Sequence, residues 1–198
     1  ETIILADGDF PSHPLALEWL RQCPYVVCCD GAANTYIRSG RMPEAIVGDG
    51  DSLLPDIKER YASLIHSEAE QETNDLSKAF RFCLSQERKR ITIMGATGKR
   101  EDHTIGNVSL LADYMEQAEV SMMTDYGIFV PIREDSMFES YIGQQISVFN
   151  MNSTALSAEG LAYPLSVFTN WWQGTLNEAL ARHFIIRTEG KVLVFRVF

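Results

Sequence analysis

The first two-thirds of the chain alternate short apolar runs with segments of helical periodicity. The apolar runs, typical of buried strands, are TIILAD, YVVCCD, AIVGD, RITIMG and EVSMMTD. The segments between them repeat apolar residues every three or four positions, as in PLALEWLRQC, GAANTYIRSG, LLPDIKERYASL, NDLSKAFRFCLSQ and HTIGNVSLLADYMEQ. Repeated strand–helix units predict a Rossmann-like α/β domain, in which a parallel sheet carries helices on both faces.

The pattern changes after residue 132. Short alternating runs follow, broken by glycine, proline and asparagine: ESYIGQQISVFNMN, ALSAEGLAYPLSV and HFIIRTEGKVLVFRVF. The last of these predicts a hairpin with its turn at Glu189-Gly190. We therefore predict two domains, an α/β domain over residues 1–132 and a smaller antiparallel β-sandwich over residues 133–198.

The chain is acidic, with 27 Asp and Glu against 17 Lys and Arg and a formal net charge of -10. Proteins that bind nucleic acid or anionic membranes need a basic face, so this balance argues against both classes. No apolar run approaches the roughly 18 residues that cross a bilayer, and no leader pattern is visible, so the cytoplasm is the expected location. Four cysteines without a C-x-x-C pair are predicted to be reduced residues of the core or its margin. They are Cys23, Cys28, Cys29 and Cys83.

Acidic residues follow the predicted strands of the α/β domain. In such a sheet, ligands bind beyond the carboxyl ends of the strands. The turns at those ends are residues 7–9, 30–31, 49–51, 71–75 and 95–103, and each contains at least one Asp or Glu. Carboxylates that converge on one crevice repel one another unless cations lie between them. Oxygen ligands favour a hard ion, Mg²⁺ or Mn²⁺.

The motif GDGDS carries two of these carboxylates. If its backbone is extended, Asp49 and Asp51 point to the same side with Cα atoms about 6.6 Å apart, and can share one metal ion or hold two. Gly50 between them would let phosphates approach the backbone. A solvated Asp/Gly turn is the alternative.

The motif QETNDLSKA opens a predicted helix. Thr73 or Asn74 can cap that helix, and the helix dipole favours Asp75 in its first turn. Capping does not exclude a ligand role for Asp75, because the start of this helix faces the same crevice.

The motif GATGKREDH is rich in glycine but lacks the spacing of a Walker A loop. Lys99 and Arg100 bring positive charge to an acidic edge, which suits a phosphate chain. Asp102 can orient Arg100 or cap the following helix. His103 is either a structural residue of the first turn or a ligand.

The motifs CDGAAN, GDGDS, QETNDLSKA, GATGKREDH and GLAYPL…GTLNEA occur in this order along essentially the whole chain. In order and spacing the chain resembles the thiamine pyrophosphokinases. Members of that family transfer a pyrophosphoryl group from ATP to the hydroxyl of thiamine, which gives thiamine diphosphate and AMP. They use Mg²⁺ and act as homodimers, with active sites between the α/β domain of one chain and the β-sandwich of the other. The resemblance implies the same substrates, metal and assembly here.

The resemblance also assigns roles to residues. The expected metal ligands are Asp49, Asp51 and Asp75, which form the expected catalytic set with Arg100. The expected nucleotide and phosphate site comprises Asp30, Gly31, Asn34, Lys99, Arg100, Asp102 and His103. The expected thiamine contacts are Gln71, Thr175, Asn177 and Trp172.

Two positions depart from the family pattern. Asn74 stands where Thr is usual, and its amide can replace the hydroxyl as a hydrogen-bonding group, so the role of Asp75 is expected to survive. Leu176 stands where Ser is usual, so Thr175 or Asn177 is expected to supply the missing contact. The pair Trp171-Trp172 suits a core or an interface, but Trp is also the best surface for a cationic thiazolium.

The expected reaction is in-line attack by the thiamine hydroxyl on the β-phosphorus of ATP, helped by positioning and charge neutralisation. A carboxylate of the cluster could accept the hydroxyl proton, and the sequence singles out none. Two alternatives stay open. One is another Mg²⁺-dependent phosphotransferase or nucleotide hydrolase on the same fold, and the other is a non-catalytic thiamine- or nucleotide-binding module.

Overall fold

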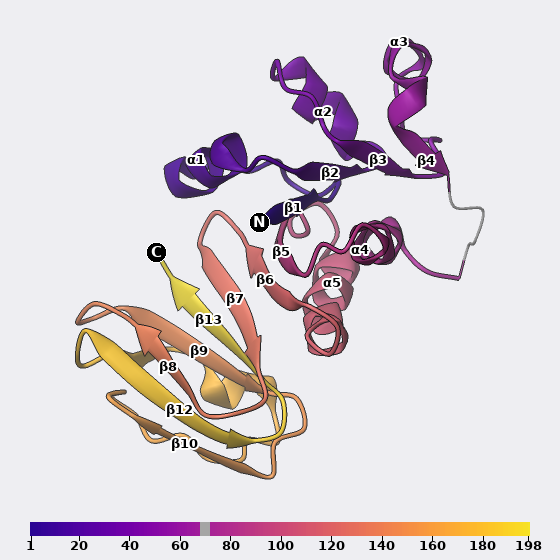
Figure 1. Cartoon of the computed structure of the whole chain (residues 1–198). Helices are drawn as coiled ribbons and strands as arrows, with labels where there is room; N and C mark the ends of the chain where they lie inside the picture. Colours follow the sequence, from indigo (N-terminus) through magenta and orange to yellow (C-terminus); the bar gives the residue numbers. More distant parts are fainter. Residues whose placement is uncertain (68–71) are drawn as a thin grey trace. The chain divides into compact units, whose positions relative to one another are not determined.

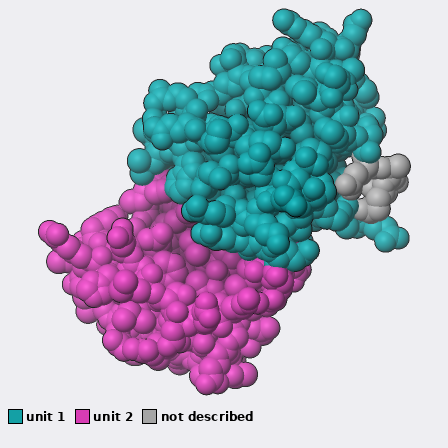
Figure 2. Space-filling view, in the orientation of Figure 1, with its two compact units in different colours: residues 1–110, 117–125 teal, residues 111–116, 126–198 magenta. Residues whose placement is uncertain are grey.

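The computed structural model describes residues 1–67 and 72–198. These residues form two compact units, the first with residues 1–110 and 117–125 and the second with residues 111–116 and 126–198 (Figure 2). The division at residues 125 and 126 comes before the domain boundary expected after residue 132. The strand Gly127–Ile132 accounts for the difference, because it belongs to the second unit.

The first unit contains a sheet of six parallel strands in the order β6-β5-β1-β2-β3-β4 (Figure 1). Its strands are β1 (Thr2–Leu5), β2 (Val26–Cys29), β3 (Ala45–Gly48), β4 (Ile65–Ser67), β5 (Arg90–Met94) and β6 (Glu119–Met123). Its helices are α1 (Pro14–Gln22), α2 (Ala32–Arg38), α3 (Pro55–Arg60), the 3-10 turn η1 (Ala62–Leu64), α4 (Asp75–Ser85) and α5 (Glu101–Tyr114). Figure 1 shows α2 and α3 on one side of these strands and α4 and α5 on the other. The predicted α/β fold is confirmed, and β4 is an addition that its partly exposed residues did not reveal.

Burial explains why this sheet was visible in the sequence. Every residue of β1, β2 and β3 is buried, since helices cover both faces, so these strands appear as continuous apolar runs. Helix α4 buries the stripe Leu76, Ala79, Phe80 and Cys83, and the side chain of Asn74 caps its start by accepting a hydrogen bond from the Ser77 backbone N at 2.9 Å. Cys28, Cys29 and Cys83 are buried and Cys23 is half-buried, which confirms their predicted location in the core or its margin. Among the described residues, no helix is both long and apolar enough to cross a membrane.

The strand order places a crevice at the centre of the sheet. From β1 the chain adds β2, β3 and β4 on one side, and then returns through α4 to β5 on the other side of β1. The connections therefore diverge between β1 and β5. In open α/β sheets this is the point at which ligands bind, beyond the carboxyl ends of the strands.

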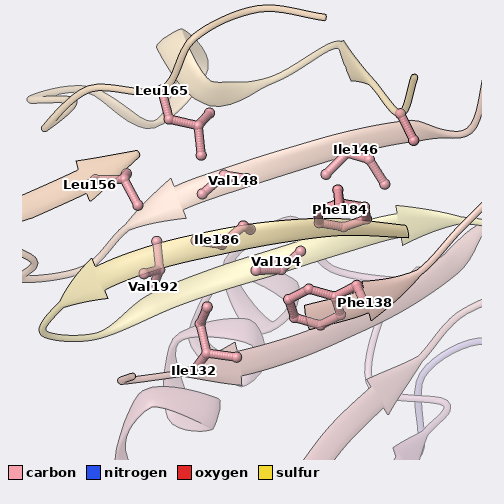
Figure 3. Packing of buried hydrophobic residues seen from close by; sticks show 11 residues of the cluster. Ile132, Phe138, Ile146, Val148, Leu156, Leu165, Phe184, Ile186, Val192 and Val194 are labelled. Carbon is pink, nitrogen blue, oxygen red and sulfur yellow. The ribbon is translucent and has the colours of Figure 1, made fainter. Parts of the chain in front are cut away.

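The second unit is an antiparallel sandwich. One layer has the order β11-β9-β13-β7 and the other β10-β12-β8. The strands are β7 (Gly127–Ile132), β8 (Ser136–Glu139), β9 (Gln145–Asn150), β10 (Ala155–Glu159), β11 (Asn177–Glu178), β12 (His183–Glu189) and β13 (Val192–Val197), with the 3-10 turn η2 at Trp171–Gly174. Side chains of both layers meet in one core, where Val148, Phe184, Ile186 and Val194 are buried (Figure 3). The predicted β-sandwich is confirmed.

The predicted hairpin at Glu189-Gly190 is wrong. Strand β12 pairs with β10 and β8, whereas β13 pairs with β7 and β9 in the other layer. The chain crosses between layers at Gly190, whose φ of +118° suits glycine alone. The alternation of apolar and polar residues predicted correctly that both strands face a core. It did not reveal that the two strands lie on opposite sides of that core.

The segment after β1 is tied down by Asp125. Its carboxylate accepts hydrogen bonds from the backbone N of Ser12 and of His13, each at 2.9 Å, and from the Ser12 hydroxyl. Partial burial opposes ionisation of Asp125, but these hydrogen bonds outweigh it and lower its pKa.

A carboxyl whose pKa is lowered by folding stabilises the fold above its unfolded-state pKa and loses this effect as the pH falls through its folded-state pKa. We therefore expect Asp125→Asn to lower the melting temperature at pH 7, and the difference from wild type to shrink below about pH 4. Thermal unfolding of wild type and variant at pH 7 and at pH 3 measures this difference. An equal difference at pH 7 and pH 3 would contradict it.

Candidate active site

A pocket of about 440 Å³ lies at the switch point of the parallel sheet. Its wall is built from the turn after β1, the end of β2, the start of α4, the turn after β5 and the first turns of α5. Four of the residues proposed from the sequence line it, namely Asp75, Lys99, Arg100 and His103. The tertiary structure thus brings together side chains from two motifs that lie far apart along the chain.

The glycine-rich turn after β5 places the two cations. Gly95 and Gly98 have φ values of +65° and +84°, which lets the turn fold back tightly, and Lys99 itself has a φ of +31°. The Lys99 ammonium donates to the backbone O of Asp7 at 2.8 Å and lies 3.1 Å from its Oδ1. This contact joins the turns after β5 and β1 across the switch point.

Arg100 is oriented by Asp102. Its Nε and Nη2 donate to the two carboxylate oxygens of Asp102 at 3.1 and 2.6 Å. The hydrogen bonds raise the pKa of Arg100 and lower that of Asp102. Asp102 Oδ1 also accepts from the backbone N of His103, so this residue both orients the guanidinium and satisfies a backbone N–H in the first turn of α5.

Asp30 is a buried carboxylate, with only 3% of its surface exposed. Its Oδ2 accepts a hydrogen bond from the backbone N of Ser52 at 3.0 Å, whereas its Oδ1 is buried without a partner among the described residues. Burial raises its pKa, and the charges of Asp75 and Asp49 raise it further. The charges of Asp75, at the start of α4, and of Asp49, after β3, therefore both act on Asp30.

The GDGDS segment is a turn, and the extended geometry considered from the sequence is wrong. Gly50 has a φ of +77°, which bends the backbone between the two aspartates. Asp49 Oδ1 accepts from the backbone N of Asp51 at 3.0 Å, and the Lys58 ammonium donates to the backbone O of Gly50 at 2.9 Å. Asp49 and Asp51 are both exposed.

Asn34 and Asp30 hold this turn in place. The Asn34 amide donates to the backbone O of Ser52 at 2.8 Å and accepts from the backbone N of Leu54 at 3.0 Å. Gly31 has no side chain to obstruct Asp7, whose Oδ2 lies 2.5 Å from where a Cβ would stand. The DGAAN motif thus positions the acidic turn, which was not foreseen for Asn34.

A second connection fixes the start of α4. The amide of Asn74, besides capping the helix, donates to Asn107 Oδ1 at 3.2 Å, and Asn107 donates in turn to the backbone O of Ala96 at 2.9 Å. The amide at position 74 therefore links the start of α4 to α5 and to the turn after β5.

The donor chemistry of this region fits a divalent cation, although no finished coordination sphere is present. In residues 1–67 and 72–198, no group of three or more His, Cys, Asp or Glu side chains is arranged to hold a metal ion. The unpartnered Oδ1 of Asp30, next to the charges of Asp49 and Asp75, is nevertheless a buried oxygen donor that a hard cation would satisfy. Gln71 lies outside the described residues.

The remaining predicted residues belong to the second unit. Trp172 is 74% exposed, and the hydroxyl of the exposed Thr175 donates to its backbone O at 2.7 Å. Asn177 is buried, and its side chain donates to the backbone O of Tyr163 and accepts from the backbone N of Tyr163 and of Glu178. These bonds give Asn177 a structural role in joining the Tyr163 loop to β11.

Several residues that line the pocket were not proposed from the sequence. They are Asp7, Cys29, Asn74, Thr104 and Asn107, together with apolar and glycine neighbours. The turn that contains Asp7 was among the acidic strand ends singled out from the sequence, although no role was assigned to Asp7 itself. Asn107 gives no comparable signal, since it lies in the middle of a helix.

Two family models match the chain. The model described as "Thiamin pyrophosphokinase, catalytic domain" matches residues 16–123, and that described as "Thiamin pyrophosphokinase, substrate-binding domain" matches residues 127–195. Among the relatives, thiamine pyrophosphokinase 1 of Oryza sativa subsp. japonica is 30% identical over 129 residues, which cover 52% of this chain and 49% of that protein. Thiamine pyrophosphokinase of Bacillus subtilis is 34% identical over 86 residues, which cover 41% of this chain and 40% of that protein. The chain spans about half the length, or less, of the curated relatives it matches.

Solved structures share the fold over the whole chain. The crystal structure of thiamine pyrophosphokinase from Bacillus subtilis matches with a TM-score of 0.82 at 21% identity, covering 100% of this chain and 99% of that one. Thiamin pyrophosphokinase from Candida albicans matches with a TM-score of 0.79 at 20% identity, covering 100% and 90%. The α/β unit followed by a β-sandwich is therefore the architecture of these proteins.

Proposed function

The chain belongs to the thiamin pyrophosphokinase family, and from this premise we propose that it transfers the pyrophosphoryl group of ATP to the hydroxyl of thiamine, giving thiamine diphosphate and AMP. The observation that supports this most directly is the pocket at the switch point. It brings the cations Lys99 and Arg100 to the same place as the carboxylate of Asp75. A site for a polyphosphate and its counter-ion needs this combination.

In the proposed reaction, the thiamine hydroxyl oxygen forms a bond to the β-phosphorus of ATP. The bond from that phosphorus to the oxygen bridging to the α-phosphorus breaks, and AMP leaves with the bridging oxygen. The hydroxyl proton passes to a carboxylate of the cluster or to solvent. Lys99 and Arg100 hold the polyphosphate, with Asp102 keeping the guanidinium in one orientation. Held in line, the two reactants need little further reorganisation.

We propose that Mg²⁺ assists, held by Asp49, Asp51 and Asp75, with the unpartnered oxygen of Asp30 as a further donor. When bound, a divalent cation offsets charge on the phosphate oxygens. The chain's own contribution is to hold the acidic turn through Asn34 and the Asp30–Ser52 contact. The nucleotide contacts proposed for Gly31, Asn34 and His103 belong to the same site.

We place thiamine recognition in residues 133–198, with Trp172 and Thr175 as the contacts, and ATP and metal binding in residues 1–132. Asn177 acts there by shaping the neighbouring loop, and Gln71 completes the proposed set. We also propose a homodimer and a cytoplasmic location. Exposed apolar side chains of the second unit support the dimer, because Tyr163, Trp172 and Leu176 are 64%, 74% and 73% exposed. Light scattering of the purified chain tests the assembly.

An assay of the products tests the proposed function. ATP, thiamine and Mg²⁺ are incubated with the chain, and AMP, ADP and thiamine diphosphate are quantified with and without EDTA. Equal amounts of AMP and thiamine diphosphate, formed only without EDTA, are expected. ADP as the nucleotide product would indicate another phosphotransferase or a hydrolase, and binding of thiamine or ATP without turnover would indicate a binding module.

Asn34→Ala tests whether this residue positions the acidic turn. We expect a loss of about 1 kcal/mol in the free energy of unfolding, since two hydrogen bonds disappear, and a fall of about 10-fold in turnover. Asn152→Ala is a matched control, because its side chain accepts from the backbone N of Lys191 in the second unit. It is expected to lower stability while leaving turnover unchanged. Unchanged turnover in Asn34→Ala would refute the positioning role.

A further inference from the structure

Two charged side chains are buried among the described residues, and each interacts with Asp75 of the candidate site. Asp30 is 3% exposed and Lys78 is 5% exposed. Lys78 lies one turn along α4 from Asp75, and its ammonium is 3.2 Å from Asp75 Oδ1.

The burial of Lys78 needs an explanation. A lysine on a helix surface can usually extend its ammonium into water, and a buried charge is costly unless it is paired. The side chain of Lys78 is 6% exposed, whereas that of its partner Asp75 is 37% exposed. Asp75 lines the pocket and Lys78 does not. The ammonium therefore supports the carboxylate from the protein side, while the carboxylate faces the pocket.

The charge of Lys78 matters to more than its direct partner. The charge of Asp75 acts on Asp30, and so does that of Asp49. The buried ammonium offsets the negative charge of Asp75 directly, because it lies 3.2 Å from the Oδ1 of that carboxylate. Because the lysine holds Oδ1 of Asp75, Oδ2 of the same carboxylate is the oxygen left to a ligand in the pocket.

We propose that Lys78 is a positioning residue, whose buried ammonium fixes the carboxylate of Asp75 and, by offsetting its charge, limits how tightly Asp75 attracts a divalent cation. This inference rests on the proposed function for its catalytic consequence, but its effect on cation binding does not depend on thiamine or ATP. It predicts opposite changes in two quantities. Without the ammonium, the uncompensated carboxylate of Asp75 binds a divalent cation more tightly, while turnover falls because Asp75 is no longer held.

A purely structural lysine would behave differently. Its removal would change the stability of α4 and nothing else at a temperature where the protein is folded. The affinity for a divalent cation in the absence of nucleotide therefore separates the two roles.

The test uses Mn²⁺ as the probe, with its binding to the nucleotide-free full chain followed by electron paramagnetic resonance. The Lys78 ammonium lies 3.2 Å from Asp75 Oδ1, and charges this close interact strongly at the dielectric of a protein surface, so Lys78→Met is expected to lower the Kd for Mn²⁺ by about 10-fold. The same variant is expected to lose at least about 10-fold in kcat for AMP formation. Equal Mn²⁺ affinity in wild type and folded Lys78→Met would overturn the proposal.

A second variant separates charge from orientation and serves if Lys78→Met does not fold. Lys78→Gln removes the charge but keeps an N–H group that can donate to Asp75. It is expected to bind Mn²⁺ as tightly as Lys78→Met while keeping more turnover than that variant. A wild-type Kd for Mn²⁺ in Lys78→Gln would refute the charge argument.

Lys191→Met is the matched control. The Lys191 side chain is 23% exposed, and its ammonium pairs with Glu116 at 2.8 Å and donates to the backbone O of Ala112 within the second unit. It is expected to lose stability with unchanged Mn²⁺ affinity. A wild type that binds Mn²⁺ but forms no thiamine diphosphate would contradict the proposed function alone, and the Kd comparison would still decide the role of Lys78.

Discussion

Asp51→Asn is expected to reduce the rate of AMP formation by at least about 100-fold, because an amide cannot offset the charge of a divalent cation held at the acidic turn. The fold should be preserved. Asp51 is exposed, and the hydrogen bond that shapes the turn runs from its backbone N to Asp49 Oδ1, which the substitution leaves in place. The free energy of unfolding should change by less than about 0.5 kcal/mol.

The measurement is the steady-state rate at several Mg²⁺ concentrations, together with thermal unfolding. Asp56→Asn is the control, since it removes an exposed carboxylate in the first turn of the neighbouring helix α3. It is expected to retain turnover. Full activity of Asp51→Asn would exclude this residue from the metal site.

Asp30→Asn is expected to abolish turnover and at the same time to stabilise the metal-free protein. The unpartnered Oδ1 of Asp30 is buried, and a buried unsatisfied polar group costs about 1–3 kcal/mol. The side-chain oxygen of Asn can still accept from Ser52, and its amide N–H can donate toward the neighbouring carboxylates. We expect a gain of about 1 kcal/mol in the free energy of unfolding at pH 7, measured in EDTA.

The pH dependence follows from the direction of the pKa shift. Burial, with the charges of Asp75 and Asp49, raises the folded-state pKa of Asp30. The destabilisation of the folded protein by the Asp30 carboxylate is therefore absent below the unfolded-state pKa of Asp30 and develops as the pH rises through its folded-state pKa. The advantage of Asp30→Asn should disappear below about pH 4. Urea unfolding of wild type and Asp30→Asn at pH 7 and below pH 4 tests this pH dependence.

Two comparisons sharpen this prediction. Asp30→Ala removes the acceptor for the Ser52 backbone N and should destabilise the protein, in contrast to Asp30→Asn. Added Mg²⁺ should stabilise wild type more than Asp30→Asn, because binding to the folded state alone raises stability and the variant lacks one donor. If Asp30→Asn were less stable than wild type in EDTA, the inference that the buried Asp30 carboxylate destabilises the metal-free protein would be wrong.

Local sequence determined a large part of this protein. The order of strands and helices in the first unit followed from apolar runs and helical periodicity. Strands buried on both faces appear as continuous apolar runs, and helices with one buried stripe repeat apolar residues every three or four positions, so both patterns can be recognised within a few residues. The acidic turns and the glycine-rich turn were visible for the same reason. The cap of α4 was also local, since Asn74 binds the backbone only three residues ahead.

Strand pairing was decided by the tertiary structure. The prediction of two strands from the alternation in β12 and β13 was correct. The two strands nevertheless belong to different layers, because the choice of pairing partner depends on residues far away in the chain. Strand β4 was missed because one of its three residues, which pair with β3, is half-buried and the other two are exposed.

The chemistry of the site shows the same division. The sequence identified Asp49, Asp51 and Asp75 as candidates, but not the bend at Gly50 or the buried states of Asp30 and Lys78. Burial and unpartnered atoms depend on packing by segments distant in sequence, and no local pattern records them. The sequence by itself therefore determined which functional groups the protein carries. Tertiary packing decided which of them share a pocket and which charged groups are buried at a cost in folding free energy.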